Sequence, residues 1–228
     1  MPDIPPGPWL NVGSGPSNAA AWINFDGSWQ ARVAGHRWLA TLGRRALGVD
    51  VGHWPKGVRY RDIRRGLPYG HDSVAVVYAS HVLEHLHRAD TVRFLAHARQ
   101  LLKRGGVCRV VVPDVHAIVN WYLANRDEPK AQKTGSSSDL LMGMLMLRGP
   151  EAHSRNPFLD IVRRVADLHE HKWMYDQEGL QAVFEEAGFV GPEGRRYLES
   201  AIPGEPLAQV ERPDRLCDGA GVCVEAMK

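Results

Sequence analysis

Cysteine is scarce in this sequence of 228 residues. The three cysteines, Cys108, Cys217 and Cys223, include no C-x-x-C pair. An odd count without such a pair argues against a disulfide framework and against a zinc ribbon. We therefore expect reduced cysteines with a structural role.

Long apolar runs and a strong net charge are also lacking. No run approaches the roughly 18 apolar residues that cross a bilayer, and "MPDIPPGPWL" lacks the basic and apolar regions of a signal peptide. A net charge of +2 is too small to indicate nucleic-acid binding, and the arginines are dispersed. We expect a cytoplasmic protein with neither a nucleic-acid nor a membrane partner.

The third glycine of a dinucleotide-binding fingerprint is missing as well. In "LNVGSGPSNAAAWINFD", Gly13 and Gly15 fit the first two glycines of G-x-G-x-x-G, but Asn18 stands at the third. Asp26 follows at about half the usual ~20-residue distance to the ribose-binding acid. The intervening residues leave room for a helix of only a turn or two, whereas a pyrophosphate usually takes a longer helix N-terminus. A ligand with a ribose but no phosphate, such as S-adenosylmethionine, fits this segment better.

Alternating strands and helices are predicted for most of the chain, in an α/β fold. Helical spacing of apolar residues favours helices at 29–47, near 81–86, at 90–105 and at 176–188, with Asp90 and Asp176 as caps and Gly105 and Gly188 as stops. Continuous apolar runs indicate strands buried on both faces, ending at Ala79 and before Asp114. Shorter strands are expected at 22–26, 57–62, 195–200 and 221–228.

The alternation is interrupted at 115–174 by helical segments and a polar stretch. Such an insertion is a candidate lid over an active site. We therefore expect a cofactor-binding half at 1–114, a helical insertion for the acceptor at 115–174, and a final helix and strands at 175–228 that complete the sheet. Ligands should gather at the carboxyl ends of the parallel strands.

Five segments resemble the class I S-adenosylmethionine-dependent methyltransferases in order and near spacing. They are "LNVGSG", "WINFD", "RDIRRGLPYGHDSVAVVYASHVLEHL", "LLKRGGVCRVVVPD" and "EGLQAVFEEAGF". The similarity is greatest to a small bacterial branch, of the methyltransferase type 11 kind, in which the second strand follows the glycine turn almost directly. The resemblance implies a Rossmann-like, doubly wound and mostly parallel sheet with a helical cap insertion.

The resemblance also implies which residues bind the cofactor. The glycine turn of Gly13, Ser14 and Gly15 would approach its methionyl part, and Asp26 would accept hydrogen bonds from the ribose hydroxyls, with Asp50 as the rival for that role. The remaining expected contacts are Asp62 at the adenine amino group, Ile63 beside the ring, and Ser80 and His81 on the sulfonium side. The alternatives left open are ordinary loop or capping aspartates and a packed histidine.

Methyl transfer to an alcohol needs a group that takes the hydroxyl proton, and histidine is the usual general base. The insertion offers His116, His153, His169 and His171. We predict that the base is among His81, His153 and His169. No metal ligand is assigned, although a divalent cation such as magnesium is left open at Asp114.

The acceptor class follows from the resemblance alone, which suggests O-methylation of a sugar or oligosaccharide in polysaccharide biosynthesis. A natural-product phenol or another small molecule is the alternative. A nicotinamide oxidoreductase and a non-catalytic scaffold that only binds the cofactor stay open as rivals from other classes, and a homodimer is left open too.

Overall fold

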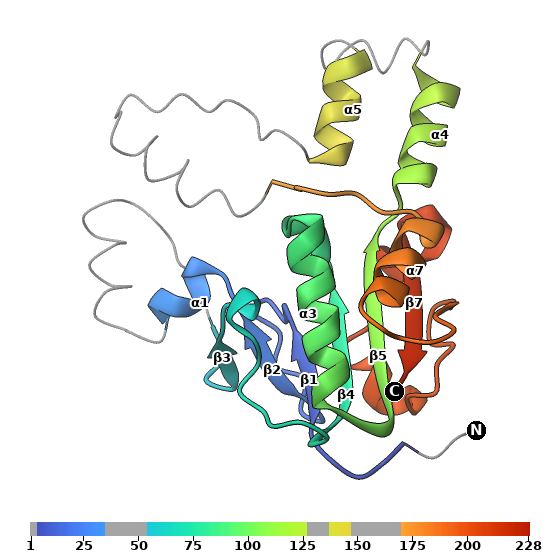
Figure 1. The fold of residues 1–228 in the computed structure, drawn as a ribbon. Helices are drawn as coiled ribbons and strands as arrows, with labels where there is room; N and C mark the ends of the chain where they lie inside the picture. The colour runs from blue at the N-terminus through green and yellow to red at the C-terminus, as the bar shows by residue number, and fades with distance from the viewer. Residues whose placement is uncertain (1–3, 35–53, 127–136, 147–169) are drawn as a thin grey trace, which may run out of the picture.

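The computed structural model describes residues 4–34, 54–126, 137–146 and 170–228. Within them, seven strands form one sheet in the order β3-β2-β1-β4-β5-β7-β6. Strands β1 to β5 run parallel, whereas β7 is antiparallel to both β5 and β6. The predicted Rossmann-like α/β fold is confirmed (Figure 1). The strands are β1 (Trp9–Val12), β2 (Ile23–Asp26), β3 (Val58–Tyr60), β4 (Val74–Ser80), β5 (Leu102–Pro113), β6 (Glu193–Gly194) and β7 (Gly221–Met227).

Helices cover the sheet and extend beyond its edge (Figure 1). Their bounds are α1 (Trp29–Ala34), α3 (Arg88–Leu101), α4 (Val115–Asn125), α5 (Ser137–Leu145), α7 (Gln177–Glu186) and α8 (Gly204–Ala208). Short 3-10 turns lie at Ile63–Arg65, Leu83–His85, Pro213–Arg215 and Cys217–Gly219. In the described part of the chain, no helix has both the length and the apolar character needed to span a membrane.

Two apolar cores lie on opposite faces of the sheet. On one face, Phe94 and Leu95 of α3 pack with Leu180 and Phe184 of α7. On the other, Trp22 and Leu207 join side chains of β4, β5 and β7. Every residue of β4 is buried, as the continuous apolar run predicts for a central parallel strand.

The link between β1 and β2 contains turns but no helix. The buried Asn24 side chain holds it, because its amide donates to the carbonyl oxygens of Ala19 at 3.0 Å and Trp22 at 3.1 Å. Its own oxygen accepts from Asn11 Nδ2 at 2.9 Å, which ties β2 to β1. Side-chain hydrogen bonds thus replace the helix of the usual βαβ unit and bring Asp26 close to the glycine turn.

Several predicted boundaries are confirmed. Asp176 caps α7 by accepting from the Gly179 amide at 2.7 Å, and Gly188 follows the helix with a φ of 91°. Strand β2 ends at Asp26, and all three cysteines are free thiols. The predicted helix at 29–47 is observed over Trp29–Ala34, and its remainder lies outside the described residues.

Other expectations are wrong. His87, not Asp90, is the N-cap of α3, and β5 begins at Leu102, so Gly105 lies inside the strand and does not stop the helix. The segment 195–200 is not a strand, because Arg196 and Glu199 turn their carbonyl oxygens toward Arg109. The helix expected near 81–86 is only a 3-10 turn.

A buried ion network joins β5 to the C-terminal segment. Arg109, with no exposed surface, forms a bidentate pair with Glu211 at 2.8 and 3.0 Å and contacts Glu225 at 3.2 Å. Its guanidinium also donates to the carbonyl oxygens of Glu199 and Arg196, each at 2.9 Å. All five N–H donors of this arginine are therefore used.

We predict that Arg109→Met lowers the free energy of unfolding by about 3 to 5 kcal/mol, because it leaves two buried carboxylates without their cation. Urea denaturation followed by circular dichroism measures this change. Arg104→Met, an exposed arginine on the same strand, is the control and should change stability little. Equal effects of the two substitutions would contradict the structural role of the network.

Candidate active site

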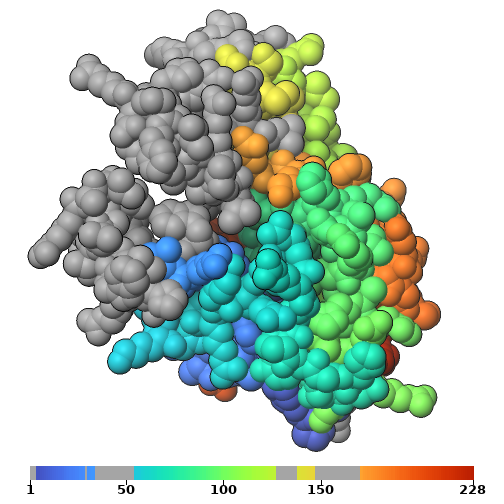
Figure 2. Space-filling view, turned by 60° about the vertical axis from the view of Figure 1, so that its left-hand side comes forward, coloured from blue at the N-terminus to red at the C-terminus, as the bar shows by residue number. Residues whose placement is uncertain are grey.

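A cavity of about 550 Å³ opens at the carboxyl ends of β1, β2 and β4. It brings together every residue expected to bind the cofactor, namely Gly13, Ser14, Gly15, Asp26, Asp62, Ile63, Ser80 and His81. Figure 2 shows the blue α1 segment against the cyan segment after it, and Arg32 of α1 lies over the Tyr60 ring at 5.7 Å. The lining of the cavity itself runs from Asn11 to Arg215, so segments that are distant in the sequence form one site.

The glycine turn is bonded directly to the end of β2. The amides of Gly13 and Ser14 both donate to the Phe25 carbonyl oxygen, at 2.8 and 3.0 Å. Gly13 has a φ of 72°, and a Cβ there would lie 2.0 Å from Val82 Cγ2. Gly15 has a φ of 58°, but a Cβ there would meet no atom within 4 Å. Gly13 is thus required by close packing, while Gly15 is favoured by its backbone conformation and borders open space.

Asp26 fixes the same turn through its carboxylate. Its Oδ2 accepts from the Gly15 amide at 2.9 Å and its Oδ1 from the Ser28 amide at 2.8 Å. The side chain is only 8% exposed and lies on the cavity wall. Because each carboxylate oxygen has a second lone pair, Asp26 can still accept hydrogen bonds from a ligand.

Asp62 and Ile63 form the wall beside β3. Asp62 caps the 3-10 turn by accepting from the Arg64 amide, and it forms a bidentate pair with the Arg64 guanidinium at 2.9 Å for both bonds. The hydrogen bond from Arg64 lowers the pKa of Asp62, so this carboxylate is ionised at neutral pH. Ile63 is buried and presents an apolar surface to the cavity.

Ser80 and His81 close the cavity at the end of β4. Ser80 is 5% exposed, and Arg215 Nη1 lies 3.4 Å from its hydroxyl oxygen. His81 has a φ of 56°, an unusual conformation for a side chain with a Cβ, and its Nε2 is buried with no hydrogen-bond partner among the described residues. Burial, and secondarily the charge of Arg215, lower the pKa of His81 to about 4. Its imidazole is therefore neutral at pH 7.

Glu84 lies beneath His81 with no exposed surface. Its Oε1 is 3.5 Å from His81 Nδ1, yet neither carboxylate oxygen has a hydrogen-bond partner in the described part of the chain. Burial raises the pKa of Glu84 to about 8. The two pKa shifts agree that this contact joins neutral groups and is not an ion pair.

The sequence matches the model of a methyltransferase domain family over residues 2–191. The chain belongs to the class I S-adenosylmethionine-dependent methyltransferases. S-adenosylmethionine is therefore its methyl donor. The predicted methyltransferase is confirmed, in place of a nicotinamide oxidoreductase or a non-catalytic scaffold. No protein of curated function matches the sequence significantly.

Solved methyltransferase structures resemble the chain at low sequence identity. A Thermotoga maritima protein described as a possible histamine N-methyltransferase is 15% identical, with a TM-score of 0.48, over 98% of this chain and 83% of its own. A Mesorhizobium loti S-adenosylmethionine-dependent methyltransferase is 16% identical, with a TM-score of 0.48, over 100% of this chain and 94% of its own. An Archaeoglobus fulgidus methyltransferase is 14% identical, with a TM-score of 0.45, over 97% of this chain and 86% of its own. The family assignment depends on the match to the family model and not on these structures.

The remaining candidates from the sequence are either outside the described residues or placed on another element. His153, His169 and Asp50 fall outside the described residues. His116 is exposed on α4, where its amide donates to Asp114 at 2.9 Å. Asp114, the residue at which a divalent cation was left open, is thus the N-cap of α4.

Three cationic side chains that sequence reasoning did not assign line the methyltransferase cavity: Lys172, Arg212 and Arg215. Arg212 and Arg215 belong to the C-terminal segment next to the Arg109 network. No local motif marks them, because their position depends on long-range contacts. Asp214 holds Arg212 at 2.9 and 2.7 Å and offsets its charge, whereas Lys172 and Arg215 add positive charge to the lining.

We predict that Asp26→Asn weakens binding of S-adenosylmethionine and of its demethylated product by about 1.5 to 3 kcal/mol. The amide carries less negative charge, and its NH₂ group would face a backbone N–H of Gly15 or Ser28. Isothermal titration calorimetry measures the affinity. Asp50→Asn is the matched comparison; should it weaken binding while Asp26→Asn does not, the ribose-binding acid is misassigned.

Proposed function

We propose that this methyltransferase transfers the methyl group to a hydroxyl of a small polar acceptor, a sugar or oligosaccharide, with His81 as the general base. The observation that supports this proposal is the position of His81. Its imidazole lies at the end of β4 on the cavity wall, with Nε2 buried and without a hydrogen-bond partner among the described residues. A left-handed conformation at a residue with a Cβ costs about 1 to 3 kcal/mol, and such strain clusters at active sites.

The reaction is an in-line displacement at the methyl carbon. The acceptor oxygen forms a bond to that carbon while the carbon–sulfur bond breaks, and the electron pair stays on sulfur. The hydroxyl proton passes to the imidazole of His81 and then to solvent. The enzyme contributes alignment and exclusion of water, besides accepting the proton.

The charge of the cavity supports a polar acceptor. Lys172, Arg212 and Arg215 line it together with Asn11 and Gln209. These donors suit an acceptor rich in hydroxyl or acidic groups better than a purely aromatic phenol. The sugar class itself comes from the family resemblance. The roles expected for residues 115–174 as the acceptor lid, and for His153 and His169, remain predictions.

A screen of acceptor pools with labelled S-adenosylmethionine tests the acceptor class. We expect label in hydroxyl-bearing saccharides as a base-stable methyl ether, identified by mass spectrometry and NMR. Transfer exclusively to nitrogen, or to phenols in preference to sugars, would contradict the proposed acceptor.

His81→Ala tests the base. We predict a kcat about 10²- to 10⁴-fold lower, because the proton no longer has an acceptor in place, while S-adenosylhomocysteine still binds through its other contacts. His87→Ala is the control, because His87 is an exposed histidine six residues further along the chain. Near-normal turnover of His81→Ala would show that another group accepts the proton.

A further inference from the structure

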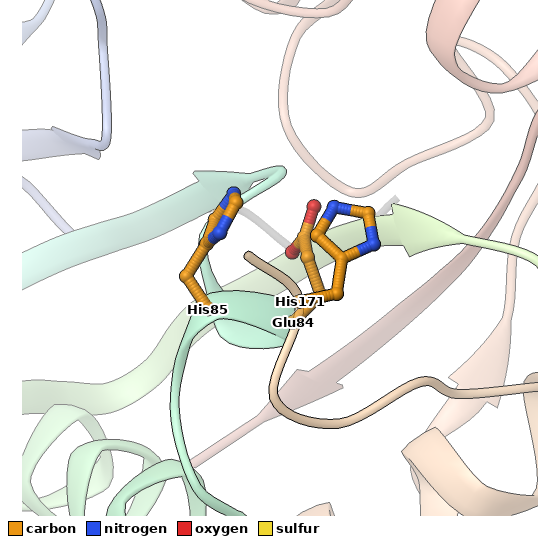
Figure 3. Close-up of side chains that lie close together, drawn as sticks. All are labelled: Glu84, His85 and His171. Carbon is orange, nitrogen blue, oxygen red and sulfur yellow. The ribbon is translucent and has the colours of Figure 1, made fainter. Parts of the chain in front are cut away.

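Beside the proposed base, two further histidines and a glutamate meet at the edge of the cavity. One donor atom from each of Glu84, His85 and His171 lies within 4.8 Å of the others (Figure 3). Glu84 and His85 belong to the 3-10 turn after β4, whereas His171 lies in the segment that leads to α7. The two segments are far apart in the sequence. His85 contacts the carbonyl oxygen of Glu170, which is 85 positions further along the chain.

Backbone hydrogen bonds hold this convergence in place. The amides of Lys172 and Trp173 both donate to the Glu84 carbonyl oxygen, at 2.7 and 3.2 Å. The His171 amide donates to the Met146 carbonyl oxygen at 2.9 Å, at the end of α5. The rings of His85 and His171 lie 5.0 Å apart, edge to face. The two segments that carry the cluster are therefore held together by their backbones.

The carboxylate of Glu84 is the feature that calls for a ligand. It is fully buried, and neither oxygen has a hydrogen-bond partner among the described residues. An unpaired buried carboxyl group costs several kcal/mol unless a partner satisfies it. Each such group in a folded protein needs an explanation, and a bound ion is one that also accounts for two adjacent imidazoles.

We infer that Glu84, His85 and His171 bind a divalent first-row transition-metal ion such as Zn²⁺, Mn²⁺ or Fe²⁺. Two imidazoles and one carboxylate suit these ions, whereas Mg²⁺ and Ca²⁺ prefer oxygen ligands alone. With metal–ligand bonds of about 2.1 Å, ligand atoms lie about 3.4 Å apart in a tetrahedral shell. A small inward movement of the three side chains brings their ligand atoms to this spacing.

The contact at Nδ1 of His85 matches that of a ligating histidine. A histidine that binds a metal through one nitrogen usually has a partner at the other, which orients the ring. His85 Nδ1 lies 3.3 Å from the Glu170 carbonyl oxygen, and His171 Nδ1 lies 3.2 Å from Met174 Sδ. Three protein ligands would leave a coordination position open, as in catalytic sites.

The site adjoins the cofactor cavity, because His85 is part of both. A metal ion there would polarise an acceptor oxygen and lower the pKa of a hydroxyl. This catalytic role of the ion rests on the proposed hydroxyl acceptor, whereas binding of the ion does not. If the protein binds the metal but methylates nitrogen, the metal site stands and the proposed function is wrong.

Titration of the chelator-treated full chain with Co²⁺ tests the site. Calorimetry should give one ion per chain, and the visible absorption of Co²⁺ should show nitrogen and oxygen ligands. Changing residues around a ligand costs about 10- to 100-fold in affinity, so we expect His171→Ala and Glu84→Gln to lose at least about 100-fold. His87→Ala, which changes an exposed histidine two residues from His85, should bind like the wild type.

Melting temperature and affinity for S-adenosylhomocysteine show whether each variant is folded. If Glu84→Gln does not fold, His171→Ala decides the test alone. Substoichiometric binding by the wild type, or undiminished binding by folded His171→Ala, would overturn the metal site.

Discussion

The hydrogen bonds between the glycine turn and the end of β2 are the constraint on which the site depends. Two amides of the turn share the Phe25 carbonyl oxygen, and the Gly15 amide bonds to the neighbouring Asp26 carboxylate. This arrangement requires that β2 follow the turn closely, and Asn24 makes the short link feasible by satisfying its carbonyl groups. The carboxylate therefore reaches the turn without the long helix of a dinucleotide-binding unit.

The opposite wall of the cavity depends on a second, long-range set of contacts. Arg109 in the buried strand β5 holds Glu211 by two hydrogen bonds, and Arg215 follows a few residues later at the cavity. Arg215 then approaches Ser80 and lowers the pKa of His81 in addition to burial. A network that stabilises the sheet thus also holds the segment that brings Arg215 beside Ser80 and His81.

Local patterns predicted what local forces determine. The apolar stripe of α7, its Asp176 cap and the fully buried strand β4 follow from spacing and capping chemistry, and Asp26 follows from the end of a short apolar strand. Residues 195–200 do not form the predicted strand, because Arg196 bonds to Arg109, which is 87 positions away in the sequence. No local pattern reveals such a contact. The meeting of Glu84 with His171 likewise depends on contacts between segments far apart in the chain, which no spacing in the sequence indicates.

A crystal structure of the complex with S-adenosylhomocysteine tests the central claim most directly. The account places the ribose hydroxyls within hydrogen-bonding distance of Asp26, the adenine between Asp62 and Ile63, and the sulfur atom facing Ser80 and His81. The glycine turn should keep its bonds to Phe25. A ribose bound to a different carboxylate, or a sulfur atom directed away from His81, would contradict the account.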